Sequence, residues 1–127
     1  MQYQPQAVPP TAGHQCARPS PAEMLHVQVC SNDELSFLME AHDGLSATIA
    51  QRSGFKGLWA SGLSIASSLG YRDANEASWS QLVQSVERIV DSTELPVLVD
   101  GDGGFGNFNN ARLLAETSSG WRGRRLA

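Results

Sequence analysis

The amino-acid sequence predicts an α/β fold with a parallel sheet, and three observations lead to this prediction. From residue 34 onward, short apolar runs alternate with amphipathic segments in the order β, α, β, α, β, α. The connections are short, as expected between parallel neighbours joined by right-handed crossovers. The last apolar run, 94–100, has a proline near its start and is rich in Val and Leu, which is typical of a buried parallel strand. Candidate site residues should therefore follow the strand ends, where chemistry gathers in such folds.

Residues 1–33 are expected to form a Pro-rich, largely disordered leader. Five of the six prolines fall within residues 1–21, and large apolar side chains are almost absent there. Such a segment cannot bury enough apolar surface to offset the entropy of ordering it. After it, residues 34–116 are expected to form the α/β domain, and residues 117–127 a basic tail of different character.

Six elements are predicted within the domain. The strands cover residues 35–41, 55–61 and 94–100, and the helices cover residues 44–53, 78–91 and 109–116. The first helix places Leu45, Ile49 and Ala50 on one face, and Gly54 is expected to end it.

The helix over residues 78–91 carries the strongest local signals. Ser78 and Gln81, three residues apart, form a capping box at its start. Apolar residues recur at helical spacing behind this cap, namely Leu82, Val83, Val86, Ile89 and Val90. This face is predicted to pack in the core.

Composition and charge exclude several classes of protein. Thirteen acidic against nine basic residues give a formal charge of −4, and the basic residues have no interleaved aromatics, so nucleic acid is not an expected partner. No apolar run approaches the roughly 20 residues that cross a bilayer, and the first residues lack a secretory signal pattern. We therefore expect a cytoplasmic protein without a membrane partner, in which Cys16 and Cys30 are free thiols.

The segment VDGDGGFGNFNN, residues 99–110, is the strongest candidate for chemistry. Asp100 and Asp102 leave a buried strand two residues apart, and a glycine-rich turn follows them. Paired carboxylates at a strand end suit a hard divalent cation such as Mg²⁺. The alternative is a turn in which the aspartates cap backbone amides and the glycines supply positive φ.

The same segment matches two other motifs in part. Gly101, Gly103 and Gly106 fit the G-x-G-x-x-G pattern of dinucleotide-binding folds. Asp102 lies inside that pattern, where it would repel a pyrophosphate, so the nucleotide interpretation is disfavoured. An EF-hand loop is also disfavoured, because Gly104 and Phe105 stand where a calcium ligand and the invariant glycine would be required.

Other strand ends carry weaker signals. Ser61 and Gly62 in WASGLS can present a hydroxyl and backbone amides to an oxyanion, or can simply form a turn. Asp73 and Glu76 lie in an unusually polar connection, where surface carboxylates are the ordinary expectation. In MEAHDG, residues 39–44, the acidic and histidine side chains are more typical of a hydrogen-bonded structural group than of a metal site, and they receive no role.

Taken together, the order and spacing of these phrases resemble the phosphoenolpyruvate mutase family of the isocitrate lyase superfamily. ASGLS, RDANEASW and DGDGGFGNFNNAR carry the resemblance, which runs from about Leu35 to about Glu116. It implies the first three βα units, a partial TIM-type (β/α)₈ barrel. It also implies an isomerase that interconverts phosphoenolpyruvate and phosphonopyruvate with Mg²⁺, forming a C–P bond in phosphonate biosynthesis.

The resemblance also implies roles for particular residues. Asp100 and Asp102 match the metal-binding carboxylates, and Asp73 matches an active-site aspartate that orients the transferring group. The stretch that matches the family's substrate-binding residues consists of Trp59, Ser61, Gly62 and Leu63. Gly103 departs from the family pattern, which usually has Thr or Ser there, and loss of that hydroxyl would loosen the surroundings of the metal.

Several family features are not found in this sequence. A complete barrel of this kind needs about 250 residues, and the family's later glutamate, mobile loop, Arg and His have no counterparts here. We therefore expect the chain as written to be a truncated and inactive form, with a homo-oligomer possible only at full length. Two alternatives stay open: a fragment of a phosphonopyruvate hydrolase or related C–C lyase, and a non-catalytic remnant that binds a full-length paralogue.

Overall fold

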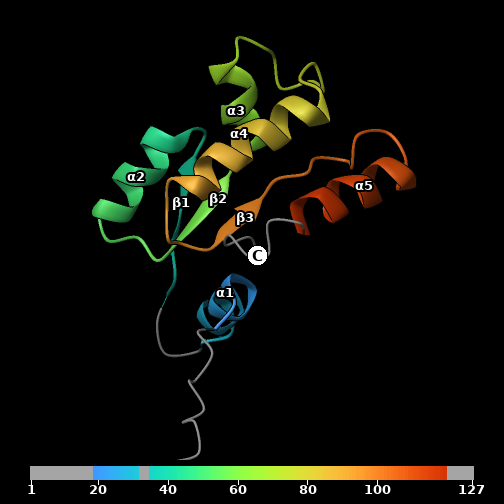
Figure 1. Cartoon of the computed structure of the whole chain (residues 1–127). Helices are drawn as coiled ribbons and strands as arrows, with labels where there is room; N and C mark the ends of the chain where they lie inside the picture. Colours follow the sequence, from blue (N-terminus) through green and yellow to red (C-terminus); the bar gives the residue numbers. More distant parts are fainter. Residues whose placement is uncertain (1–18, 32–34, 120–127) are drawn as a thin grey trace, which may run out of the picture.

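A computed structural model describes residues 19–31 and 35–119 of the chain (Figure 1). Its centre is a three-stranded sheet in the order β1-β2-β3. The strands are β1 (Leu38–Ala41), β2 (Gly57–Ala60) and β3 (Val97–Val99), and both pairings are parallel. The predicted α/β fold with sequential parallel strands is confirmed.

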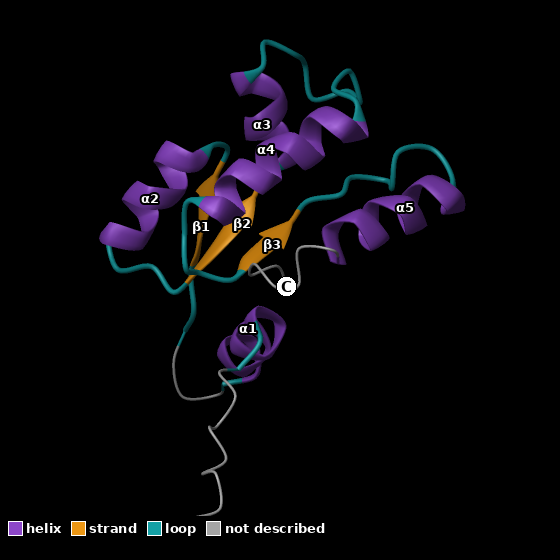
Figure 2. Ribbon diagram, viewed as in Figure 1, coloured by secondary structure: helices purple, strands orange, loops and turns teal. Residues whose placement is uncertain are grey.

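Five helices surround this sheet in the described residues (Figure 2). They are α1 (Pro21–Cys30), α2 (Gly44–Arg52), α3 (Gly62–Ser68), α4 (Trp79–Asp91) and α5 (Phe108–Ser119). Helices α2, α3 and α4 supply the side chains that pack on one face of the sheet. No helix within the described residues is both long and apolar enough to span a bilayer.

The core lies between that face of the sheet and α4. Leu58, Ala60 and Val97 from the strands have no exposed surface, and Ile89 and Val86 of α4 are 0% and 1% exposed. Burial of an aliphatic side chain of this size contributes about 1.5–3 kcal/mol. Four of the five residues predicted for the core face of α4 are buried, whereas Val83 is half-buried. The predicted capping box forms: Ser78 Oγ accepts from the Gln81 amide while Gln81 Oε1 accepts from the Ser78 amide.

Helix α2 packs only partly through the predicted face, because Ala50 is the one predicted residue of the three that is buried. Leu45 and Ile49 are 69% and 55% exposed, whereas Ala47 and Ala50 are buried. Small residues allow the α2 backbone to lie close to the sheet and to α4. At the start of α2, a Cβ on Gly44 would lie 3.3 Å from the carbonyl oxygen of Arg88.

Helix α1 lies inside the segment expected to be a largely disordered leader, and the difference has a local cause. Ser20 and Glu23 form a capping box, with Pro21 in the first turn. Leu25 is buried, and Gln28 Nε2 donates to the carbonyl oxygen of Lys56 over 3.1 Å. These contacts fix α1 beyond the amino ends of the strands. Residues 1–18 and 32–34 of the predicted leader lie outside the described residues.

The connection between β2 and β3 contains two helices, α3 and α4. Leu69 and Gly70 end α3, and the loop that follows includes Asn75 at φ 57°. At the other end of the domain, α5 extends to Ser119, past the predicted boundary after residue 116. Residues 120–127 of the predicted basic tail lie outside the described residues.

Candidate functional site at the carboxyl ends of β2 and β3

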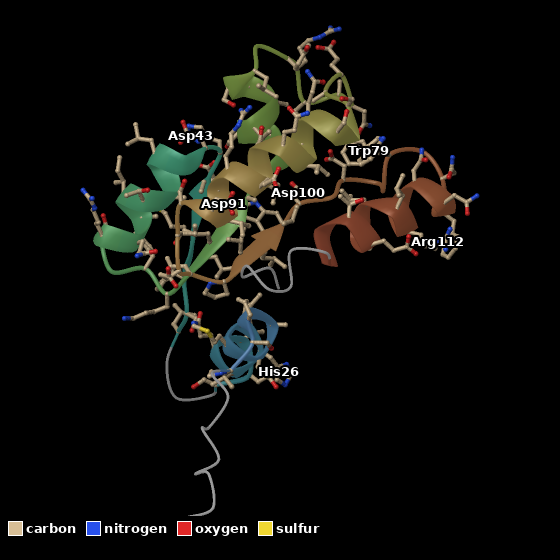
Figure 3. The ribbon with its side chains drawn as sticks, in the orientation of Figure 1. His26, Asp43, Trp79, Asp91, Asp100 and Arg112 are labelled. Atoms are coloured by element: carbon tan, nitrogen blue, oxygen red, sulfur yellow. The ribbon has the colours of Figure 1, made fainter. Side chains whose placement is uncertain are left out.

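The segments that follow β2 and β3 meet at one edge of the sheet. Ala60 pairs with Val99, so Ser61 and Asp100 are the first residues beyond the two strands. The Asp100 amide still donates to the Ala60 carbonyl over 3.0 Å. The Gly62 amide in turn donates to Asp100 Oδ2 over 3.3 Å, which links the start of α3 to the end of β3. Figure 3 shows Asp100 at the end of β3.

The Asp100 and Asp102 carboxylates lie over the same glycine. A Cβ built on Gly62 would be 3.4 Å from Asp100 Oδ2 and 3.5 Å from Asp102 Oδ1. The loop holds this arrangement, because the Asp102 amide donates to Asp100 Oδ1 over 3.1 Å. Asp102 itself has φ 46°, a conformation that Asp and Asn tolerate better than other residues with a side chain. The sequence prediction that these two aspartates come together at a strand end agrees with this geometry.

Asp73 contributes negative charge to the same place. Burial, the Asp100 carboxylate and the Asp73 carboxylate, in that order of size, raise the pKa of Asp102 above its ordinary value. Asp73 and Asp102 line one small cavity together with Gly62 and Phe105. Ionised Asp102 is therefore unfavourable in the empty site, and a bound cation would relieve this cost.

The donor set fits Mg²⁺, which takes oxygen ligands and usually keeps several waters. Asp100, Asp102 and Asp73 offer only carboxylate oxygens. Within the part of the chain that the structure describes, no group of three or more Asp, Glu, His or Cys side chains is arranged to hold a metal by itself. A cation here would therefore take part of its ligands from water and substrate.

The other predicted site residues occupy distinct positions around these carboxylates. Ser61 is buried and caps α3, since its Oγ accepts from the Ser64 amide over 3.4 Å. Leu63 is 54% exposed in the first turn of α3. Trp59 is half-buried and pairs with Leu98, so it lies on the sheet face turned away from α4. Ser61 and Gly62 adjoin the carboxylates, whereas no contact is described between Trp59 and them.

Glu76, by contrast, serves its own loop. Arg72 donates to it from both the backbone amide, over 2.9 Å, and the side-chain Nε, over 2.6 Å. These hydrogen bonds lower the pKa of Glu76. The Arg72–Glu76 ion pair closes the turn that carries Asp73. It also pairs the Arg72 guanidinium with Glu76 rather than with Asp73.

At the end of β1, the acidic and histidine side chains divide into two structural roles. Asp43 caps α2, and the hydrogen bond of 2.7 Å from the Ser46 amide lowers its pKa. His42 Nδ1 lies 3.2 Å from Glu40 Oε1. The sequence pattern assigned no role to these residues and did not single out Phe105, which lines the cavity beside Asp102. For Glu40 and His42, their position at the end of a predicted strand was the feature that could have pointed to the site.

Comparison with known proteins agrees with this geometry. A family model described as phosphoenolpyruvate phosphomutase matches residues 25–119. The chain is 55% identical over 83 residues to phosphoenolpyruvate phosphomutase of Tetrahymena pyriformis, covering 65% of this chain and 28% of that relative. It is 38% identical over 76 residues to phosphonopyruvate hydrolase of a Variovorax species, covering 60% of this chain and 26% of that relative.

Solved structures show the same arrangement of elements. Phosphoenolpyruvate phosphomutase from Streptomyces platensis subsp. rosaceus superposes with a TM-score of 0.72 at 29% identity, over 80% of this chain and 34% of that chain. A phosphonopyruvate hydrolase in complex with oxalate and Mg²⁺ gives 0.75 at 29% identity, over 81% of this chain and 36% of that chain. The chain thus spans about a third of the length of these structures, which are TIM-barrel proteins.

Proposed function

Because the chain belongs to the phosphoenolpyruvate phosphomutase family, we propose that its site interconverts phosphoenolpyruvate and phosphonopyruvate. In this reaction the O–P bond of phosphoenolpyruvate breaks and a C–P bond forms on the carbon of the same pyruvyl unit. No external oxidant, reductant or water is consumed. The product carries the C–P bond of phosphonates, which places the proposed reaction in phosphonate biosynthesis.

The observation that supports this proposal best is the pair of carboxylates over Gly62. Two backbone amides, those of Gly62 and Asp102, hold the Asp100 carboxylate in place. Asp102 lies beside it with a raised pKa. An arrangement of fixed carboxylates that is costly without a cation is expected of a metal site rather than of a simple turn.

In the proposed site, Asp100 and Asp102 hold Mg²⁺. When bound, the cation neutralises charge on the substrate's oxygens and favours the enolate form of its pyruvyl unit. Phosphoryl transfer needs positioning and charge neutralisation more than covalent help from the protein. Asp73 orients the transferring group and the water around it from the α3–α4 loop.

The substrate-binding roles belong to the end of β2. The Ser61 hydroxyl and the Leu63 amide bind substrate oxygens. The Gly62 amide donates to Asp100 Oδ2 in the structure and would exchange this acceptor for a substrate oxygen. Trp59 completes the stretch that matches the family's substrate-binding residues and lies on the face of the sheet turned away from α4. Gly103, in place of the family's usual Thr or Ser, offers no hydroxyl to the surroundings of the metal.

A second candidate is hydrolysis of phosphonopyruvate to pyruvate and phosphate. The likeness to a phosphonopyruvate hydrolase that binds oxalate and Mg²⁺ favours it, at a TM-score of 0.75. The two reactions use the same carboxylates and differ in whether water reaches the C–P bond. Identity favours the mutase, at 55% against 38% for the hydrolase.

Phosphorus NMR of the purified chain with phosphonopyruvate and Mg²⁺ separates the candidates. A phosphoenolpyruvate signal indicates the mutase, and inorganic phosphate with pyruvate indicates the hydrolase. The expectation that the 127-residue chain by itself is inactive stays a prediction, and absence of both signals would agree with it.

Metal binding tests the site independently of turnover. Calorimetric titration should show that Mg²⁺ binds to the wild-type chain and that oxalate binds more tightly in its presence. If Asp100→Asn leaves Mg²⁺ binding unchanged, the proposed metal site is wrong.

A further inference from the structure

A Glu40–His42 pair stands at the carboxyl end of β1, next to the proposed site but outside it. His42 Nδ1 lies 3.2 Å from Glu40 Oε1, and the two side chains are 37% and 38% exposed. Both are therefore accessible to a ligand. The neighbouring Asp43 takes no part in the pair, because its carboxylate accepts from the Ser46 amide at the start of α2.

The strand register places this pair on the face of the sheet turned away from α4. Glu40 pairs with Trp59, and Trp59 pairs with Leu98. The next residues along β1 and β2, Ala41 and Ala60, have no exposed surface and belong to the core under the helices. Since side chains alternate between the faces of a strand, Glu40 and Trp59 point away from α4. The contact with Glu40 keeps His42 on that side too.

His42 also falls in the same row as the site residues. Ala41, Ala60 and Val99 form the last paired row of the sheet. The residues that follow them are His42, Ser61 and Asp100. Neighbouring strands lie about 4.8 Å apart, so His42 and Asp100 flank Ser61 from opposite sides. A small ligand bound over Ser61 can be reached from both.

The hydrogen bond to Glu40 decides which ring nitrogen is available. A carboxylate only accepts hydrogen bonds, so Nδ1 must carry a proton and donate it to Glu40. Nε2 then remains for a ligand, and in the imidazolium form it is a donor. The backbone of His42 is fixed as well, because its amide donates to Ser46 Oγ over 3.1 Å.

The charges of the site make such a donor useful. Asp100, Asp102 and Asp73 offer only carboxyl oxygens to a ligand, and the proposed substrates carry a carboxylate and a phosphoryl group. Arg72, the arginine in the loop that carries Asp73, is engaged by Glu76. A ring N–H donor on the β1 side would bind an oxyanion that the carboxylates repel.

We propose that His42 is a substrate-binding residue whose Nε2–H donates to a carboxylate or phosphoryl oxygen of a ligand bound over Ser61, and that Glu40 is a positioning residue that holds the ring. This inference rests on the proposed function, because it takes the substrate's oxyanions from it. It adds β1 to the two strands that build the site.

Ring-nitrogen NMR of the full 127-residue chain tests the inference directly. The probes are oxalate, which offers carboxylates only, and inorganic phosphate, each added with and without Mg²⁺. We expect the His42 Nε2 resonance to shift with at least one probe, and the one that shifts it identifies the oxyanion. His26, which lies on α1 beyond the opposite end of the sheet, should not shift.

Two variants separate ligand binding from a purely structural role. His42→Asn keeps a donor near the Nδ1 position and loses Nε2, whereas His42→Gln places an amide near the Nε2 position. A hydrogen bond to a charged group is worth enough to change affinity by about 10-fold or more. We expect His42→Asn to weaken binding of the active probe to this extent and His42→Gln to weaken it less. The inference would be overturned if His42→Gln weakened binding more than His42→Asn and if the melting temperatures of the two variants fell in the same order.

Glu40→Gln tests the positioning role. The amide oxygen can still accept from Nδ1, but the negative charge is lost. We expect the His42 ring resonances to change in the free chain and binding of the probe to weaken less than in His42→Asn. Unchanged ring resonances would contradict a positioning role for Glu40.

The outcomes also distinguish this inference from the proposed function. If a probe shifts the Gly62 amide but leaves His42 Nε2 unchanged, the inference fails and the metal site stands. If a probe shifts His42 Nε2 equally in wild type and Asp100→Asn, with no effect of Mg²⁺, the inference stands and the proposed function fails. No shift at either position would overturn both.

Discussion

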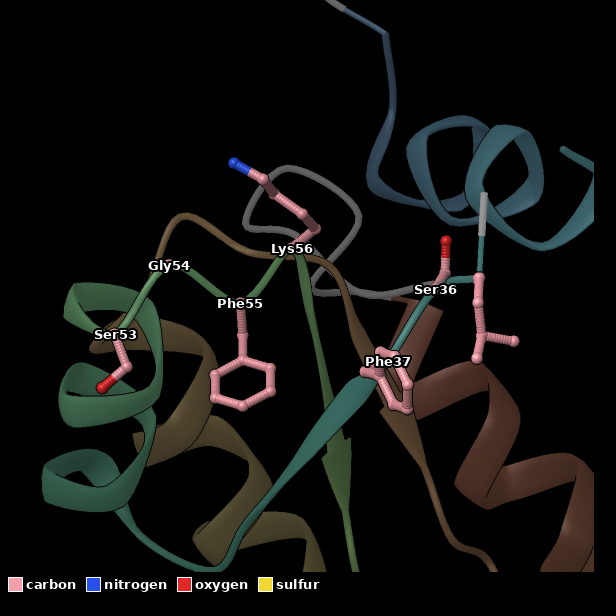
Figure 4. Close-up of a pocket in the computed structure, with 7 residues that line it drawn as sticks. Ser36, Phe37, Ser53, Gly54, Phe55 and Lys56 are labelled. Carbon is pink, nitrogen blue, oxygen red and sulfur yellow. The ribbon is translucent and has the colours of Figure 1, made fainter. Parts of the chain in front are cut away.

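The two ends of the parallel sheet differ in the residue types that surround them. At the carboxyl ends, carboxylates gather over Gly62, and Asn75, Asp102 and Phe105 adopt the left-handed region that residues with side chains rarely enter. At the amino ends, α1 contributes the buried Leu25. A pocket there has a mixed lining, in which Leu35, Phe37 and Phe55 lie beside Ser36, Ser53, Gly54 and Lys56 (Figure 4).

This contrast suggests that residues at the carboxyl ends of the strands serve ligand binding, whereas residues at the amino ends serve stability. Like charges and left-handed residues cost free energy, and they persist where a ligand can use them. Apolar contacts and a capped helix stabilise the fold without offering a donor set. We therefore expect substitutions at the carboxyl ends to change ligand binding most, and substitutions at the amino ends to change the free energy of unfolding.

Asp100→Ala should have the largest effect on binding. It removes a proposed metal ligand, and because even residues that only support a metal ligand can change affinity up to about 100-fold, we expect Mg²⁺ binding to weaken by more than that. Two backbone amides lose their acceptor, which would cost about 1–3 kcal/mol of stability. Calorimetry and urea denaturation measure the two effects, and Asp91→Asn on α4 is the control expected to bind Mg²⁺ normally.

Leu25→Ala should show the opposite pattern at the amino ends. Leu25 is 8% exposed, and truncating a buried leucine costs about 2–5 kcal/mol. We expect a value near the lower limit by urea denaturation, with Mg²⁺ binding of the folded chain unchanged. Val27→Ala, at a position 68% exposed, should change stability by less than about 0.5 kcal/mol. Equal losses in the two variants would show that α1 does not pack as described.

Ser20→Ala should remove the cap of α1 and cost about 1 kcal/mol. The effect should appear in hydrogen exchange as faster exchange of the first α1 amides, with the site amides unaffected.

The same cap should respond to pH. Hydrogen bonds to Ser20 hold the pKa of Glu23 below its ordinary 4.5. A carboxylate with a lowered pKa stabilises the fold above the pKa of the unfolded chain, and this contribution is lost as the pH falls through the folded value. Amide protection in α1 should therefore decrease below about pH 4.5, and less so in Ser20→Ala.

Asp102→Asn should have the smallest effect on stability, and the effect should be favourable. Burial and two neighbouring carboxylates raise the pKa of Asp102 above its ordinary 3.8. Its ionised form therefore destabilises the empty fold above the folded pKa, and the penalty fades as the pH falls through that value towards 3.8. Asn keeps the left-handed backbone and removes the charge, so we expect a gain below about 0.5 kcal/mol at pH 7, together with loss of Mg²⁺ binding. A destabilised variant would contradict this electrostatic explanation.

Local patterns in the sequence predicted the elements well where one physical cause dominates. The Ser78 and Gln81 side chains sufficed to place the start of α4, because a capping box depends only on residues within one turn. The strands were predicted from their apolar runs, and Asp100 and Asp102 from their position after the last one.

The predictions that were wrong or incomplete depend, at least in part, on where the chain places elements that are distant in the sequence. Periodicity in α2 placed Leu45, Ile49 and Ala50 on one face, but of these only Ala50 is buried, together with Ala47. Composition argued against α1, although Ser20 and Glu23 form a cap there and Gln28 finds Lys56 far along the chain. The Glu40–His42 contact likewise became visible only once the strand register placed it beside Ser61.

The order of the sheet, β1-β2-β3, is also the order of the chain, and this has a consequence for how the protein folds. Within the described sheet, β2 and β3 each pair with the strand made just before them. During synthesis, β1, α2 and β2 can associate as soon as residue 60 is free, and α4 can cover them before β3 adds to the edge. Contacts of modest sequence separation carry a lower cost of loop closure. We expect folding to proceed from the amino-terminal strands towards α5, with the carboxylates brought together last.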